Sequence, residues 1–195
     1  DLVLRVPDAA RRVASRIVFP DGDPTIVVHP GCTMPARTYP AERYAEVVTH
    51  LARAGAHVLL TGTTEEAPLV GRILDALPAP ERARCVPLAG MLQFAELAAV
   101  IEASDGVVTN NTGPMHVAAA MKTPVVALFA LTNPPEQWGP WRVPHRLLNR
   151  DVPCRLCYAR ACPYAQECLD VAPEEVARAT FALIADSATR AEAAV

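Results

Sequence analysis

Residues 107–121 read VVTNNTGPMHVAAAM, and this stretch decides the fold of the chain. An apolar strand, a tight polar turn and a helix of small residues follow one another here. We expect Asn111 or Thr112 to cap the helix through a side-chain oxygen, and Pro114 suits the first turn because no N–H is needed there. Gly113 leaves the backbone amides open to a ligand. A helix start with free N–H groups binds anions, so the stretch predicts a phosphate-binding turn.

The same alternation of strand and helix continues on both sides of this stretch. We expect apolar strands at 26–28, 58–60, 85–88, 107–109 and 125–129, and helices at 41–53, 65–77, 94–103, from 113 onward and at 173–187. Short continuous apolar strands separated by helices predict a parallel sheet buried on both faces. The predicted fold class is therefore α/β, a Rossmann-like doubly wound parallel sheet.

Four segments are expected along the 195 residues, a length that supports one well-buried core. They are a linker segment over 1–24 with a short helix near 9–16, a Rossmann-like domain over 25–150, a cysteine-rich loop over 151–170, and a C-terminal helix over 171–195 that packs on the domain. The proline-rich stretch 133–153 is expected to be a loop that is functional or anchored by the cysteines.

Composition excludes some classes of protein. The net charge of −3 provides no basic surface for nucleic acid, so we expect no such partner. No apolar run approaches the ~20 residues that a membrane-spanning helix needs, and no secretory leader opens the chain. Six cysteines without a disulfide-type framework favour the cytosol. The first residue is Asp1 and not methionine, which suggests a fragment of a longer protein.

The loops that follow the strands carry the unusual polar residues. They read HPGCT at 29–33 with Arg37 a few residues on, TGTTE at 61–65, Gly90-Met91, NNTGPMH at 110–116, and ALTN at 130–133. In a doubly wound sheet, ligands bind at the carboxyl ends of the strands. We therefore expect the five loops to form one crevice, and small residues, hydroxyls, an arginine and a histidine suit a nucleotide with phosphates.

Several motifs occur in one order: HPG at 29–31, RTYP at 37–40, TG at 61–62, NTGPMHVAAA at 111–120, TNP at 132–134, PCRLC at 153–157 and PEEV at 173–176. Together they resemble glycosyltransferase family 9, the ADP-heptose:lipopolysaccharide heptosyltransferases. That family has a GT-B architecture of two Rossmann-like halves. The resemblance implies that this chain is the C-terminal, donor-binding half. The N-terminal half, which supplies the acceptor site and the catalytic base, would be absent, so the fragment alone is expected to bind donor without transfer.

The resemblance also implies roles for individual residues. Arg37 stands where the family has a lysine against the donor phosphates, Glu65 where an acidic residue contacts the ribose, and Met91 where the adenine pocket is lined. Arg37 and His116 would stabilise the charge on the leaving diphosphate, and no catalytic residue proper is expected in the fragment. The full donor-binding set is Cys32, Thr33, Arg37, Glu65, Met91, Asn111, Thr112, Gly113, Pro114 and His116.

Two positions depart from the family pattern. Asn111 stands where the family has aspartate, and Ala130-Leu131 stands where Gly-Pro is usual. An amide keeps a capping role but loses a carboxylate that would face the sugar, so binding is predicted more firmly than catalysis. Three interpretations therefore stay open: an inverting transferase that moves a sugar, expected to be heptose, from ADP to a lipopolysaccharide or related glycan; a GT-B enzyme with another nucleotide-sugar; and a catalytically silent nucleotide- or glycan-binding module.

Cofactors and location follow from the same resemblance. No Asp-x-Asp motif occurs in the loops that follow the strands, so transfer is expected to need no metal. The acceptor, a glycan or a lipid-linked glycan, would bind through the N-terminal half. The protein would act in the cytoplasm, with peripheral attachment to the inner membrane as one arrangement.

The remaining feature is a cluster of four cysteines, Cys154, Cys157, Cys162 and Cys168. Four thiolates within fifteen residues can surround a structural zinc or hold an iron–sulfur cluster. The alternative is reduced, buried cysteines with at most one disulfide. Three aromatic side chains nearby are expected to pack this loop, with a sugar-stacking platform as the alternative: Trp138, Trp141 and Tyr158.

Overall fold

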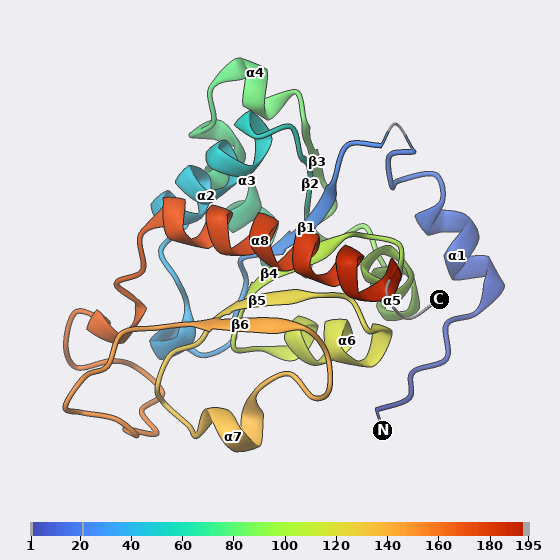
Figure 1. Ribbon diagram of the computed structural model, residues 1–195. Coiled ribbons are helices and arrows are strands. Elements are labelled where there is room, and N and C mark those ends of the chain that lie inside the picture. The colour runs from blue at the N-terminus through green and yellow to red at the C-terminus, as the bar shows by residue number, and fades with distance from the viewer. Residues whose placement is uncertain (1, 21, 193–195) are drawn as a thin grey trace.

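The computed structural model describes residues 2–20 and 22–192. Asp1 and Asp21 of the expected linker segment, and the last three residues of the expected C-terminal segment, lie outside them. Six strands form one parallel sheet in the order β3-β2-β1-β4-β5-β6 (Figure 1). The strands are β1 Thr25–His29, β2 His57–Leu60, β3 Cys85–Pro87, β4 Gly106–Asn110, β5 Val125–Leu128 and β6 His145–Leu148. The predicted doubly wound α/β class is confirmed.

Helices cover both faces of the sheet (Figure 1). They are α1 Asp8–Ala14, α2 Ala41–Arg53, α3 Ala67–Asp75, α4 Ala79–Arg82, α5 Phe94–Glu102, α6 Gly113–Met121, α7 Pro135–Trp138 and α8 Pro173–Glu192, with 3-10 turns η1 Pro35–Arg37 and η2 Glu167–Leu169. One apolar core lies between the sheet and α2, α3 and α8. A second lies between the sheet and α5 and α6. Ile26 and Val28 of β1 face the first core, and Val27 between them faces the second, which is why the strand is apolar throughout.

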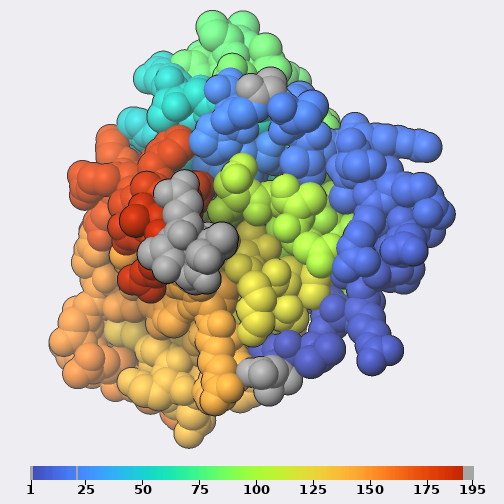
Figure 2. Space-filling view, turned by 45° about the vertical axis from the view of Figure 1, so that its right-hand side comes forward, coloured from blue at the N-terminus to red at the C-terminus, as the bar shows by residue number. Residues whose placement is uncertain are grey.

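The N-terminal segment belongs to the second layer. Helix α1 packs on α5, and Arg11 Nε donates to Glu102 Oε2 over 2.8 Å. Figure 2 shows the segment lying along the side of the molecule, beside the yellow-green atoms of α5. Phe19 stacks on His57 at the start of β2, with ring centroids 3.7 Å apart. These contacts hold residues before β1 against the sheet.

The sequence did not predict β6 and α7, which lie in the stretch expected to be a loop. Strand β6 reads HRLL and pairs with β5 alone, so it is an edge strand whose Arg146 is exposed. An edge strand lacks the continuous apolar run of a central strand, so the sequence pattern used to predict strands is missing at β6. Helix α7 is a single turn that begins after Pro134 and ends at Trp138, before Gly139. The helix expected from residue 65 begins at Ala67, because residues 63–66 form a turn in which Glu66 N–H donates to Thr63 O over 3.1 Å.

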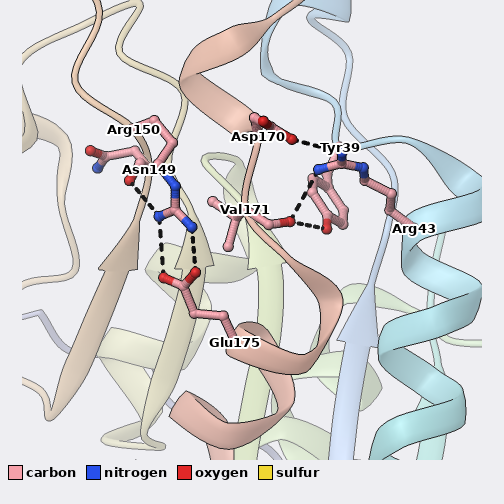
Figure 3. A network of polar contacts seen from close by, with 7 residues as sticks. All are labelled: Tyr39, Arg43, Asn149, Arg150, Asp170, Val171 and Glu175. Carbon is pink, nitrogen blue, oxygen red and sulfur yellow. Dashed lines mark hydrogen bonds and ion pairs between the residues drawn. The ribbon is translucent and has the colours of Figure 1, made fainter.

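A polar network ties the start of α8 to α2 (Figure 3). Tyr39 Oη donates to the carbonyl oxygen of Val171 over 2.6 Å, and Arg43 Nη2 donates to Asp170 over 2.7 Å. Arg150 forms an ion pair with Glu175 of α8. Burial raises the pKa of Tyr39 to about 12, so its hydroxyl stays a donor. The network fixes the last residues of the cysteine-rich loop beside the loop that follows β1.

No helix in the part of the chain that the structure describes is both long enough and apolar enough to cross a membrane.

Candidate functional site

All six strands run parallel, so the loops that follow them leave the sheet at the same edge. The strand order reverses between β1 and β4, and this topological switch point is where a doubly wound sheet opens a crevice. Asn110 at the end of β4 joins the two sides. Its Oδ1 accepts from Tyr39 N–H over 3.0 Å, and its Nδ2 donates to the carbonyl oxygen of Pro30 over 2.8 Å. The buried amide of Asn110 thus fixes the loop that follows β1.

A chain of hydrogen bonds runs from Arg37 across the loops after β1, β5 and β4. Arg37 Nε donates to Thr132 Oγ1 over 2.8 Å, and that hydroxyl lies 3.5 Å from Asn133 Oδ1. Asn111 Nδ2 donates to the same Asn133 oxygen over 2.7 Å. Within the described residues no carboxylate pairs with Arg37. The half-buried guanidinium therefore keeps its positive charge available for an anion.

The start of α6 differs in one respect from the expectation. Thr112 occupies the N-cap position, but its side chain makes no capping hydrogen bond. The side chain of Asn111 does not cap the helix either. The amide of Asn111 is turned to Asn133 instead, because both side chains are buried and each needs a partner. Pro114 lies in the first turn as predicted. Gly113 is exposed, and no atom lies within 4 Å of the position that a Cβ would take there.

His116 lies in the first turn of α6 and is half-buried. Burial lowers the pKa of His116, so the imidazole is neutral at pH 7 in the free protein. Cys32 is half-buried and Thr33 is exposed in the loop after β1.

The other wall of the crevice centres on a carboxylate that the sequence did not single out. Glu65 is exposed, and backbone and Thr63 hydrogen bonds lower the pKa of its carboxyl. The neighbouring Glu66 points inward, with Oε2 at 3.6 Å from His29 Nε2 and accepting from Thr63 N–H over 2.8 Å. A Cβ at Gly31 would lie 2.0 Å from Glu66 Oε1, so only glycine leaves room for this carboxylate. Gly31 is the one hint in the sequence to the position of this carboxylate, and it can be recognised only once the geometry of the loop is known.

A small cavity of ≈ 110 Å³ opens beside His29 and Thr63, the two residues that Glu66 contacts. Polar groups from the loop after β2 form one side, and leucines form the other. The lining residues are His29, Thr61, Gly62, Thr63, Leu88, Leu92 and Leu97. Met91, expected to line such a pocket, is 68% exposed, and the leucine that follows it enters the lining instead.

The cysteine-rich loop contacts the loop after β1, which carries Arg37, and the loop after β5, which carries Thr132. Ala36 N–H donates to the carbonyl oxygen of Arg160 over 3.1 Å, and Tyr158 N–H donates to that of Thr132 over 2.9 Å. The four cysteines of this loop are free thiols. Burial raises the pKa of Cys168, and the three other thiols act in the same direction.

One expectation about this loop needs revision, and one stays a prediction. In the described part of the chain no three histidine, cysteine, aspartate or glutamate side chains converge as metal ligands, so the structural-metal interpretation stays a prediction. The aromatic side chains expected to pack the loop are half or more exposed: Trp138 at 50%, Trp141 at 51% and Tyr158 at 67%. They project from short turns, which provide too few neighbours to bury a large ring.

The parallel sheet and the helices on both of its faces define a Rossmann-like class of domain. A family model described as glycosyltransferase family 9 (heptosyltransferase) matches residues 6–167. The chain therefore belongs to glycosyltransferase family 9, as its motifs predicted.

Individual relatives agree with this assignment. The chain is 38% identical over 112 residues to lipopolysaccharide heptosyltransferase 2 of Salmonella typhimurium, covering 57% of this chain and 32% of that protein. It is 33% identical over 156 residues to lipooligosaccharide heptosyltransferase 2 of Haemophilus influenzae, covering 77% and 44%. The solved structure of the E. coli ADP-heptose lps heptosyltransferase II has a TM-score of 0.80 and 28% identity, covering 95% of this chain and 54% of that one. The chain thus spans between a third and a little over half of these proteins.

Proposed function

We propose that this chain is the donor-binding half of a GT-B glycosyltransferase and that its crevice holds an ADP-sugar. One observation carries the proposal. Arg37, a half-buried cation that pairs with no carboxylate in the described part of the chain, is joined by hydrogen bonds to the loop that begins α6. A free guanidinium and a helix start with open amides both favour an anion, and they lie at the switch point of the sheet. A diphosphate satisfies both.

The nucleoside part of the donor is proposed to lie on the other wall. The cavity beside His29 and Thr63 has an apolar side formed by Leu88, Leu92 and Leu97, which suits a base. Glu66 contacts His29 and Thr63, two residues of that lining, and we propose that it takes the ribose role that the resemblance gave to Glu65. Glu65 is exposed, and its carboxyl has a hydrogen bond with Thr63 of the same lining, so Glu65 stays the alternative ribose contact.

The chemistry expected of the complete enzyme is inverting transfer of the sugar. Negative charge develops on the leaving diphosphate, and preorganised donors that face this charge lower the barrier. Arg37, the amides near Gly113, and His116 supply such donors. The base that deprotonates the acceptor is proposed to come from an N-terminal half, so this chain alone binds donor and does not transfer it.

Calorimetry with the 195-residue chain tests the binding proposal. We expect ADP to bind more tightly than UDP, because a purine fills the apolar side of the cavity better than a pyrimidine. A preference for UDP would support the GT-B alternative with another nucleotide-sugar. Absence of heat with every nucleoside diphosphate, repeated with a thermal-shift measurement, would contradict the site.

The sugar, the acceptor and the location belong to the same proposal. The structural relative at 28% identity is described as an ADP-heptose lps heptosyltransferase, which supports heptose as the sugar and lipopolysaccharide as the acceptor. Such an enzyme meets its donor in the cytoplasm and its lipid-linked acceptor at the inner membrane. We therefore propose a cytoplasmic protein with peripheral membrane contact and no nucleic-acid partner.

His116 makes ADP binding depend on pH. Because burial lowers the pKa of this imidazole, it is neutral at pH 7 in the free chain. A diphosphate beside it favours the protonated form and raises the pKa again. Binding then takes up protons, and ADP affinity should rise as pH falls from 8 to 6, by up to about tenfold for each unit by which the pKa rises. Calorimetry in two buffers of different ionisation enthalpy measures the uptake.

The matched variants for this experiment are His116→Asn and His50→Asn. ADP protonates itself in the same pH range, and His116→Asn shows how much of the pH dependence that contributes. His50 lies far along α2 and pairs with Glu174 over 3.4 Å, so its replacement should leave the proton uptake unchanged. Equal uptake by the unmodified chain and His116→Asn would remove His116 from the site.

Asn111 is the observation that favours the alternative of a silent binding module. An aspartate at this position would face Asn133 Oδ1, which Asn111 now contacts over 2.7 Å, so the Asn133 amide would have to turn over. In a longer protein that includes the N-terminal half, we expect the unmodified enzyme to transfer sugar. We expect Asn111→Asp to change the rate by less than about tenfold, or about 1.4 kcal/mol.

Asn133→Asp is the control for this substitution. Its carboxylate can accept from Asn111 Nδ2 without any rotation, so it adds the charge but keeps the hydrogen bond. A radiolabelled-sugar transfer assay compares the three proteins. No transfer by the unmodified protein, with transfer gained by Asn111→Asp, would favour the silent module.

The four clustered cysteines test the structural-metal interpretation. Because their thiols do not converge as ligands, we expect all six cysteines of the chain to titrate as free thiols after unfolding in chelator-free buffer. Metal analysis of the same preparation should find no stoichiometric zinc or iron. One metal per chain, with four thiols protected until a chelator is added, would restore the structural-metal interpretation.

A further inference from the structure

The Arg37 side chain is oriented by Thr132, but the two residues lie in segments with little regular structure of their own. Arg37 ends the three-residue turn η1, and Thr132 lies in the turn that follows β5. Arg37 Nε donates to Thr132 Oγ1 over 2.8 Å, and Thr132 is 2% exposed. A 3-10 turn of this length provides few internal hydrogen bonds. The positions of both atoms therefore depend on what packs against the two segments.

The cysteine-rich loop binds the backbone on the Thr132 side. Cys157 N–H donates to the carbonyl oxygen of Leu131 over 3.4 Å, and Tyr158 N–H donates to that of Thr132 over 2.9 Å. From further along the loop, Cys168 Sγ accepts from Leu131 N–H. Leu131 thus has both of its backbone polar groups engaged by this loop, one residue before Thr132.

The same loop binds the backbone on the Arg37 side. Gln166 Nε2 donates to the carbonyl oxygen of Pro35 over 2.7 Å, and Ala36 N–H donates to that of Arg160 over 3.1 Å. Pro35 and Ala36 are the first two residues of η1, which Arg37 completes. Gln166 has a φ of 57°, in the left-handed region that residues other than glycine rarely adopt, and the hydrogen bond to Pro35 is part of what holds it there. The cysteine-rich loop therefore contacts η1 and the turn after β5 at the same time.

The part of the loop that carries these contacts is anchored in the core. Leu169 is 2% exposed and belongs to the core that α2, α3 and α8 cover, and Cys168 packs against the same core. Arg150 N–H donates to the carbonyl oxygen of Cys168 over 2.9 Å. Two residues after Leu169, the carbonyl oxygen of Val171 accepts from Tyr39 Oη (Figure 3). The end of the loop is therefore a fixed base for the contacts that it makes.

We propose that Gln166 and Cys168 are positioning residues: they hold the Arg37 guanidinium where it binds the diphosphate of the donor. Gln166 acts through η1 and Cys168 through the turn after β5, and neither contacts the donor. The inference rests on the proposed function, since it needs a diphosphate beside Arg37. An arginine side chain loses rotamer freedom when it binds, and a guanidinium that is already oriented loses less. The cysteine-rich loop thus strengthens binding of the phosphates without contributing to binding of the nucleoside.

Calorimetry of the complete 195-residue chain with inorganic pyrophosphate and with adenosine tests the proposal. Gln166→Ala and Cys168→Ala should each weaken pyrophosphate binding by about two- to tenfold, the range for the ordering of one flexible side chain. Adenosine, which has no phosphate, should bind both variants as it binds the unmodified chain. Cys168→Ser should keep most of the pyrophosphate affinity, because its hydroxyl oxygen can accept from Leu131 N–H.

The matched controls are Gln137→Ala and Cys85→Ala. Gln137 is exposed in α7, and Cys85 lies in β3 at the far edge of the sheet. Both controls should bind pyrophosphate as the unmodified chain does. Equal losses of pyrophosphate and adenosine affinity in Gln166→Ala and Cys168→Ala would overturn the proposal, because a general distortion of the crevice does not distinguish the two ligands. Unchanged pyrophosphate affinity in one variant would remove that residue from the positioning role, and in both would overturn it.

Nitrogen-15 NMR of the arginine Nε–H groups measures the positioning without any ligand. The Arg37 Nε–H, held by Thr132 Oγ1, should exchange slowly with water in the unmodified chain and lose this protection in Thr132→Val, which removes the acceptor. Gln166→Ala and Cys168→Ala should lose part of the same protection, and Cys168→Ser should keep it. Protection that is unchanged in both alanine variants would overturn the positioning role whatever their affinities.

The two measurements separate failure of this inference from failure of the proposed function. If the unmodified chain binds no pyrophosphate, the proposed function fails, while the exchange of Nε–H still reports whether the loop positions Arg37. If the unmodified chain binds pyrophosphate and the alanine variants bind it equally well, the inference alone fails. The Gln166 side chain is half-buried and lies outside the core, so Gln166→Ala carries the test even where Cys168→Ala fails to fold.

Discussion

Replacing Arg37 by alanine should weaken ADP binding by about 10–100-fold, because the diphosphate loses a charged donor worth roughly 1.5–3 kcal/mol. Arg37 is half-buried, is oriented by Thr132, and has no carboxylate partner among the described residues. Removing Arg37 therefore leaves no described carboxylate without its partner in the free chain. Adenosine, which lacks phosphates, should bind both proteins equally. Calorimetry with the two ligands measures the difference.

Two further variants make the Arg37 result specific. Arg37→Lys restores the residue that the family usually has and should recover part of the ADP affinity, since lysine binds phosphate as a point charge and arginine as a fork. Arg72→Ala removes an exposed cation of α3 and should leave affinity unchanged. An Arg37→Ala chain that binds ADP and adenosine with equal losses would place the phosphates elsewhere.

Replacing Leu60 by alanine should lower the free energy of unfolding by about 3 kcal/mol, within the range of ~2–5 kcal/mol for fully buried leucines. Leu60 ends β2, is 0% exposed and lies in the core beneath α2 and α3. The loss combines transfer of the missing carbons with the cavity left behind. For a domain of this size the melting temperature should fall by about 6–12 °C, which differential scanning calorimetry measures.

Leu2→Ala is the matched control for Leu60→Ala. The chemical change is the same, but Leu2 is 40% exposed, so the free energy of unfolding should change by less than ~0.5 kcal/mol. Equal effects at the two positions would mean that β2 does not lie in the core. The Leu60→Ala chain should also bind ADP at a temperature where it is folded, since Leu60 is not part of the cavity lining.

The two halves of the candidate site were predictable to different degrees. The turn at Asn111–His116 could be read locally, because strand, turn and helix start adjoin in the sequence and each has its own signal. The partners of that turn could not. Arg37 and Thr132 are 95 residues apart, and Asn111 and Asn133 are 22 apart, so only the packed sheet brings them together. The side-chain cap expected of Asn111 failed for this reason, since a buried partner took its amide.

The sequence by itself determined the parallel sheet, the edge of the sheet at which the polar loops gather, and the family. These properties can be read from short stretches of sequence, because continuous apolar runs such as that of β1 indicate strands buried on both faces of a parallel sheet. The tertiary structure decided between residues that the sequence pattern alone cannot distinguish. Glu65 and Glu66 are adjacent and chemically identical, yet only the turn before α3 directs one of them past Gly31 to His29. That choice depends on backbone direction and on the space between loops, which exist only once the chain is folded.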